Sequence, residues 1–183
     1  MRSNVPEKLI EICHEIAIRG NARLTRLTVL KKWLGYPGRL PPFAIWVASR
    51  AISGKGQTTC EAAALLGQAR TLLAGVSPDA PKLDLKFAKL LHDRLRSFQD
   101  EYKCHRWGAV RIIDDWNLML VERALAIYLR RADSPEHGYK LAADYAQHYD
   151  SRWGNGLNGP SRTRIQEMAR FMRKLEVTQE IRH

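Results

Sequence analysis

Apolar side chains recur along most of this chain at intervals of three or four residues, the period of one face of an α-helix. The pattern is most regular over residues 84–103, where the spaced apolar side chains are Phe87, Leu91, Leu95, Phe98 and Tyr102. The alternation of period two that is typical of a half-buried strand is absent outside the ambiguous segment Ala22–Leu34. The sequence therefore predicts an all-α protein.

Clusters of glycine, proline and asparagine divide the chain into eight segments with helical spacing. The expected helices are Val5–Arg19, Ala22–Leu34, Phe43–Ile52, Thr59–Ala74, Asp84–Lys103, Ala109–Arg131, Ser134–Tyr149 and a last helix from Pro160 or Ser161 to Leu175. Phe43–Ile52 is apolar nearly all round and Ala109–Arg131 over most of its circumference, so both are expected in the core. Three glycines within Gly154–Gly159 predict a loop.

Length and composition favour one domain over residues 1–183, an irregular bundle of six to eight helices, because 183 residues with 45% hydrophobic content suffice for one sizeable core. No stretch approaches the roughly 18 consecutive apolar residues of a membrane-spanning helix, and the first ten residues lack the apolar region of a signal peptide. Three scattered cysteines, Cys13, Cys60 and Cys104, do not form a disulfide framework. We therefore expect a cytoplasmic protein without membrane contact.

Charge adds an indication of function to the predicted fold. The chain has 30 Lys and Arg residues and 19 Asp and Glu residues, which gives a formal net charge of +11. Such an excess creates a positive field that attracts polyanions, of which nucleic acid is the commonest. The charge lies at the two chain ends: the first fifty residues carry nine basic and three acidic residues, and residues 151–183 carry seven and three. The leading interpretation is a non-enzymatic protein without cofactor that binds RNA or DNA phosphates within a larger nucleoprotein assembly.

The C-terminal basic group is the first set of candidate binding residues: Arg152, Trp153, Arg162, Arg170, Arg173 and Lys174. On the last predicted helix Arg162, Arg170 and Arg173 share one face with Gln166, whereas the apolar residues lie on another. Trp153 beside Arg152 suits stacking on an unpaired base, while Tyr145 at helical spacing is expected in the core.

The N-terminal basic group consists of Arg19, Arg23, Arg26, Lys31, Lys32 and Arg39. No acidic residue lies between Arg19 and Arg50, and so one-sided a run is typical of a binding surface more than of solvated decoration. If the chain ends lie close together, the two groups form one positive surface. Two other interpretations remain open. The basic residues are an ordinary solvated face, or they dock an acidic partner protein.

Residues 58–73 resemble part of a helix-turn-helix domain of the excisionase kind, from the first helix through a glycine turn to the start of the recognition helix. The matching residues are Glu61, Ala62, Ala63, Leu66, Gly67, Arg70 and Leu73. The segment departs from that family at Gln68, where an aliphatic residue is usual, and at Gly75 and Pro78, which shorten the recognition helix. The alternative is one core helix rich in Ala and Leu.

Arg131 and His137 are spaced like the arginine and histidine of HEPN-type helical ribonucleases. The resemblance implies metal-independent RNA cleavage, in which histidine acts as an acid or base and arginine holds the phosphate. The alternative is chance spacing across a helix start at Ser134 and Pro135. No histidines stand at ligand spacing from the carboxylates of Asp114, Asp115 and Glu122, so no metal site is expected.

Overall fold

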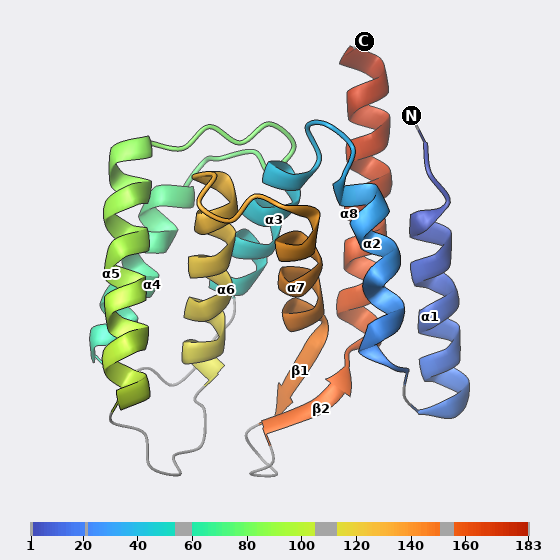
Figure 1. Ribbon diagram of the computed structural model, residues 1–183, viewed down its shortest axis with the longest axis horizontal. Helices are drawn as coiled ribbons and strands as arrows, with labels where there is room; N and C mark the ends of the chain where they lie inside the picture. The colour runs from blue at the N-terminus through green and yellow to red at the C-terminus, as the bar shows by residue number, and fades with distance from the viewer. Residues whose placement is uncertain (1, 21, 54–59, 105–112, 151–155, 183) are drawn as a thin grey trace.

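A computed structural model describes residues 2–20, 22–53, 60–104, 113–150 and 156–182. Within them the protein is an all-α bundle of eight α-helices, with one short 3₁₀-helix and one pair of strands (Figure 1). The helices are α1 (Val5–Arg19), α2 (Val29–Leu34), α3 (Leu40–Ile52), α4 (Cys60–Leu73), α5 (Leu85–Cys104), α6 (Ile113–Tyr128), α7 (Pro135–Ala146) and α8 (Arg162–Arg182). The 3₁₀-helix η1 is Leu24–Thr28, and the strands are β1 (Gln147–Asp150) and β2 (Gly156–Pro160).

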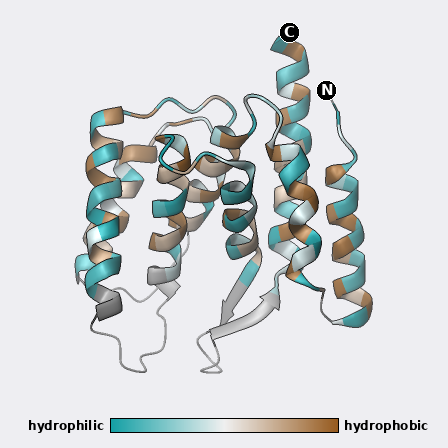
Figure 2. Ribbon diagram, viewed as in Figure 1, coloured by the Kyte–Doolittle hydropathy of each residue, from teal (hydrophilic) through white to brown (hydrophobic). Residues whose placement is uncertain are grey.

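Helices α3 and α6 form the centre of the bundle, as their apolar sequences predict. Phe43 and Ile45 on α3 and Leu118 and Leu125 on α6 are fully buried in one hydrophobic cluster. Helices α4 and α5 cover one side of this pair, and α7, α8, α2 and α1 cover the other (Figure 1). The ribbon of α5 carries hydrophobic and hydrophilic positions along its length, as an amphipathic surface helix does (Figure 2).

Helices α1 and α8 lie side by side and run antiparallel, which brings the two ends of the chain together (Figure 1). Arg2 forms a salt bridge with Glu180 at one end of this pair, and the Cys13 thiol lies 3.6 Å from the backbone oxygen of Arg162 towards the other. The two chain ends therefore lie close together, which was the condition for the two basic groups to form one surface.

Helix α7 begins where its sequence predicts, at a serine followed by proline. The Ser134 hydroxyl accepts a hydrogen bond from the backbone N–H of His137, one of the donors that a helix start leaves without a partner. At the end of α1, Gly20 adopts a left-handed φ of 79°, which glycine tolerates best.

The prediction that α7 continues to Tyr149 is wrong, because the helix ends at Ala146 and the chain continues as strand β1. Two donors satisfy the backbone carbonyls at this helix end. Arg164 donates a hydrogen bond to the Tyr145 oxygen at 2.9 Å, and the Ser161 N–H donates to the Ala146 oxygen at 2.6 Å. The predicted loop Gly154–Gly159 is also wrong from Gly156 onward, because that part belongs to β2, which pairs antiparallel with β1.

Other helix boundaries also differ from the predicted ones. The last helix extends beyond Leu175 to Arg182, since Gln179 donates to the Gly38 oxygen at 2.9 Å and Glu176 is buried. Helix α3 begins at Leu40, before the predicted Phe43, with prolines in its first turn. The segment Ala22–Leu34 is divided between η1 and α2.

The resemblance of residues 58–73 to a helix-turn-helix domain is not upheld. Residues Cys60–Leu73 form one uninterrupted helix, α4, and Gly67 lies inside it instead of making a turn. Gly75, with a left-handed φ of 71°, and the turn after it follow this helix. Ala62, Leu65, Leu66 and Leu73 are buried, so α4 is the Ala- and Leu-rich core helix of the alternative interpretation.

Candidate functional site

The C-terminal basic group lies on α8 with the predicted division of faces. Ile165, Met168, Met172 and Leu175 are fully buried, whereas Arg162, Arg170 and Arg173 are exposed. Arg173 forms a salt bridge of 2.7 Å with Glu7 on α1, and Lys174 lies 3.6 Å from Asp79. Arg162 and Arg170 have no salt bridge with any residue that the structure describes. Arg152 and Trp153 lie outside the described residues.

The N-terminal basic group is partly neutralised. Arg26 forms a salt bridge with Glu15 on α1. Lys31 pairs with Glu136 at 2.5 Å, and its ammonium lies 4.7 Å from the centre of the Tyr139 ring. Arg19, Arg23 and Lys32 are exposed and have no ion pair within the described part of the chain.

Arg39 does not belong to this surface, contrary to the sequence-based grouping. Its residue is only 2% exposed, its guanidinium stacks on Trp33 and Tyr36, and Glu176 lies 3.5 Å away. Burial lowers the pKa of Arg39, and the Glu176 carboxylate partly opposes that effect. This arginine is part of the packing between α8 and the α2–α3 region.

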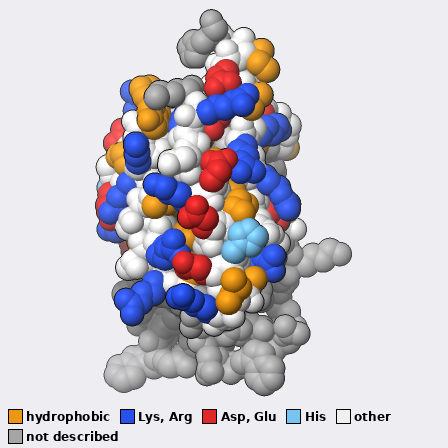
Figure 3. All heavy atoms as spheres, turned by 90° about the vertical axis from the view of Figure 1, so that its right-hand side faces the viewer, with side chains coloured by type: hydrophobic (Ala, Val, Ile, Leu, Met, Phe, Trp, Pro, Cys, Tyr) orange, Lys and Arg blue, Asp and Glu red, His pale blue; other side chains and the backbone are white. Residues whose placement is uncertain are grey.

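The two basic groups lie on the same side of the molecule, but acidic residues of α1 are interspersed with them. Figure 3 shows this side, with Lys and Arg side chains on either side of a line of Asp and Glu. Glu7 and Glu11 are exposed on α1, and Glu15 is half-buried. The surface that the two groups share is therefore a mixed one, with positive margins.

Arg131 and His137 have separate partners, which is unlike the paired residues of the ribonuclease resemblance. Arg131 lies 2.6 Å from Nδ1 of His92 and 2.7 Å from Asp93, both on α5. His137 Nδ1 lies 2.6 Å from the Ser134 hydroxyl. The buried His92 also contacts Glu122 at 2.9 Å, so Arg131 belongs to a cluster that joins α5 to α6.

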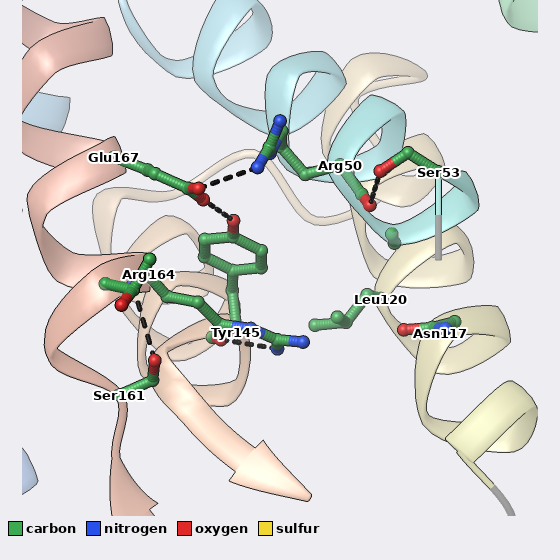
Figure 4. A pocket seen from close by; sticks show the side chains of 10 residues that line it. Arg50, Ser53, Asn117, Leu120, Tyr145, Ser161, Arg164 and Glu167 are labelled. Carbon is green, nitrogen blue, oxygen red and sulfur yellow. Dashed lines mark hydrogen bonds and ion pairs between the residues drawn. The ribbon is translucent and has the colours of Figure 1, made fainter. Parts of the chain in front are cut away.

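A polar pocket of about 350 Å³ opens between α3, α6, α7 and the start of α8 (Figure 4). Sequence reasoning did not find it, because its residues come from four separate segments. They are Arg50, Ala51, Ser53, Asn117, Leu120, Tyr145, Ser161, Thr163, Arg164 and Glu167.

One wall of the pocket is a saturated cluster of Arg50, Tyr145 and Glu167. The Glu167 carboxylate accepts one hydrogen bond from Arg50 at 2.7 Å and another from the Tyr145 hydroxyl at 2.8 Å. Burial raises the pKa of Tyr145 to about 12, so its hydroxyl remains protonated near neutral pH. Interactions with the Tyr145 hydroxyl and with Glu167 raise the pKa of Arg50. Tyr145 is 3% exposed, which confirms its expected place in the core.

A second wall is formed by the first turn of α8. Arg164 reaches from this turn across the pocket in the direction of α6, and its guanidinium lies 5.0 Å from the centre of the Tyr145 ring (Figure 4). The Ser161 hydroxyl accepts from the Arg164 N–H at 3.4 Å and caps the helix. The positive end of the helix dipole and the Arg164 charge therefore face the same space.

Asn117 on α6 completes the lining. It is only 7% exposed, and its side-chain amide has no hydrogen-bond partner among the residues that the structure describes. The amide itself is open to the space of the pocket. A signal for this residue was present in the sequence, since Asn117 is a polar residue between Trp116 and Leu118 in an otherwise apolar stretch.

Comparison with known proteins adds nothing to this geometry. No protein-family model, curated protein or solved structure matches this chain. The interpretation of the pocket and of the basic groups therefore rests on their own chemistry.

The described residues contain no group of three or more His, Cys, Asp or Glu side chains arranged to hold a metal ion. None of the described helices is both long enough and apolar enough to cross a membrane.

Proposed function

We propose that this protein binds RNA or DNA through phosphate contacts, with little discrimination between base sequences, as a non-enzymatic subunit or accessory of a larger nucleoprotein assembly. The net charge of +11 supports a polyanionic partner. Phosphate contacts supply most of the affinity in sequence-independent binding, and they need exposed cations, not a deep cleft.

The observation that carries the proposal is the antiparallel packing of α1 on α8, which brings together the two ends of the chain and the segments that hold the two basic groups. Arg162 and Arg170 are exposed on α8 and are separated by about 12 Å along the helix. Arg19 and Arg23 extend this side past the end of α1. These four arginines, together with Lys32, are the primary phosphate contacts of the proposal.

The ion-paired members of the two groups have a secondary role. Arg26, Lys31, Arg173 and Lys174 each have a carboxylate neighbour. An exposed ion pair contributes at most about 1 kcal/mol, so a phosphate can displace the carboxylate, but the net gain is smaller. Lys32 has no such pair within the described residues and belongs with the primary contacts. Arg152 and Trp153 would extend the surface on the sequence evidence alone.

An acidic partner protein is the alternative, and a salt titration separates the two. The full chain is titrated with a fluorescent single-stranded oligonucleotide, its duplex and polyglutamate at two salt concentrations. Nucleic-acid binding predicts affinity for an oligonucleotide that falls by about one power of salt per neutralised phosphate. Binding to polyglutamate without affinity for either oligonucleotide at low salt would overturn the proposal.

A further inference from the structure

The polar pocket between α3, α6, α7 and α8 has the properties of an anion site. The geometry points to a phosphate monoester as its ligand, held by Arg164, Asn117 and the first turn of α8 (Figure 4). This inference goes beyond the proposed nucleic-acid surface and does not depend on it, because none of the pocket residues belongs to the two basic groups.

The charges of the pocket favour an anion. Glu167 is the one carboxylate in the lining, and it already accepts hydrogen bonds from Arg50 and from Tyr145. Arg164 donates only to the backbone oxygens of Tyr145 and Gln147, so within the described residues no carboxylate neutralises it. The lining therefore keeps one uncompensated positive charge, next to the positive end of a helix of 21 residues.

Asn117 is an independent observation that favours a ligand. Its residue is 7% exposed, and the amide, which has no hydrogen-bond partner among the described residues, is open to the pocket and can bind a ligand there. Its two N–H bonds can donate to phosphate oxygens from the α6 side of the pocket, and the hydroxyls of Ser161 and Thr163 can donate from the α8 side. An anion in the pocket would accept hydrogen bonds from the Asn117 amide in place of water.

The size of the pocket indicates what is attached to the phosphate. About 350 Å³ lies at the lower end of the range for small-molecule sites and exceeds the volume of a phosphate group alone. Leu120 and Ala51 provide apolar contact beside the polar donors. Phosphate with one small organic group, as in a nucleoside monophosphate or at a phosphorylated end of a nucleic acid strand, fits this combination.

Calorimetric titration of the full chain at constant ionic strength tests the site, with a nucleoside 5′-monophosphate as the probe and the unphosphorylated nucleoside as its control. Short oligonucleotides with and without a 5′-phosphate distinguish the two sources of the monoester. In at least one of the two pairs, the wild type should bind the phosphorylated member at least tenfold more tightly than the unphosphorylated one. Equal binding of the two members in both pairs, or no binding of any probe, would overturn the proposal.

Two variants locate the binding. Asn117→Leu removes the amide but retains the bulk, so it should weaken binding of the monophosphate about tenfold while the melting temperature stays equal or rises. Arg164→Gln should weaken binding further, although it also removes the hydrogen bonds to the backbone oxygens of Tyr145 on α7 and Gln147 on β1. Arg182→Gln, with the same loss of charge at the far end of α8, is the matched control and should bind as the wild type does. Unchanged binding by Asn117→Leu, or equal weakening by Arg182→Gln, would contradict the site.

Discussion

The indole Nε1 of Trp33 donates a hydrogen bond of 2.8 Å to Oε1 of Glu176, and both side chains are buried. The same carboxylate oxygen accepts from the Ser3 hydroxyl at 2.8 Å and lies 3.5 Å from the Arg39 guanidinium. One carboxylate on α8 therefore joins α2, the start of α3 and the residues before α1. This cluster fixes the position of α8, on which Arg162 and Arg170 stand.

Glu176→Ala should destabilise the fold by about 3 to 5 kcal/mol, because it leaves the buried Arg39 charge without its carboxylate. Urea unfolding followed by circular dichroism measures the change. Glu180→Ala, one turn later on the same helix, removes only the exposed pair with Arg2 and should cost less than about 1 kcal/mol. Similar losses for the two variants would show that the buried cluster is not what holds α8.

Replacing the glycine inside α4 and the glycine inside α7 by alanine should have opposite effects on the stability of the fold. A Cβ at Gly67 would have no heavy atom within 4 Å, so Gly67→Ala should stabilise the protein by about 0.5 to 1 kcal/mol through helix propensity. At Gly138 a Cβ would lie 2.6 Å from Leu40 Cδ1 and 2.8 Å from Leu34 Cδ1, both in the core. Gly138→Ala should therefore destabilise by roughly 1 to 3 kcal/mol.

Thermal melts of the two alanine variants provide the measurement, with each variant serving as the control for the other. A loss of stability in Gly67→Ala would contradict the continuous helix α4 and would favour the turn that the helix-turn-helix resemblance placed there. A gain in Gly138→Ala would contradict the close packing of α7 against Leu34 and Leu40.

The ion pair of Glu7 and Arg173 should lower the pKa of Glu7 and make its contribution to stability depend on pH. The hydrogen bond from Arg173 lowers the pKa of the exposed Glu7 carboxyl. Whatever stability this pair adds is present above the unfolded-state pKa of Glu7, and it is lost as the pH falls through the lower folded-state pKa. Arg173→Ala should raise the pKa of Glu7, measured by carboxyl NMR titration, and Arg170→Ala should leave it unchanged. An equal rise in both variants would contradict the specific pairing.

The helices were predictable because burial repeats with the period of the helix. The spacing of Leu91 and Leu95 on α5 and the apolar surface of α3 depend on neighbours close in sequence. Strand β1 was not predictable in the same way, because Tyr145 and Tyr149 continue the helical spacing past the helix end. What ends α7 is the contact with Arg164 and Ser161, which follow β2 in the chain.

Long-range contacts also explain what the sequence missed at the candidate sites. Arg39 stands in a run of basic residues, yet its burial depends on Glu176, which is distant along the chain. The pocket assembles Arg50, Asn117 and Arg164 from three helices, and no local spacing connects them. Neutralisation of Arg26 by Glu15 likewise depends on how η1 packs against α1.

The salt dependence of oligonucleotide binding by a double variant, Arg162→Ala with Arg170→Ala, tests the central claim most directly. Lys86→Ala with Lys89→Ala on α5 is the matched control, because it removes two exposed cations from the opposite side of the bundle (Figure 1). Fluorescence polarisation across a salt series should show the slope of log affinity against log salt reduced by about two units in the α8 variant, since each arginine contributes about one. The control should keep the wild-type slope. An unchanged slope in the α8 variant, or an equal reduction in both variants, would contradict phosphate binding by this surface.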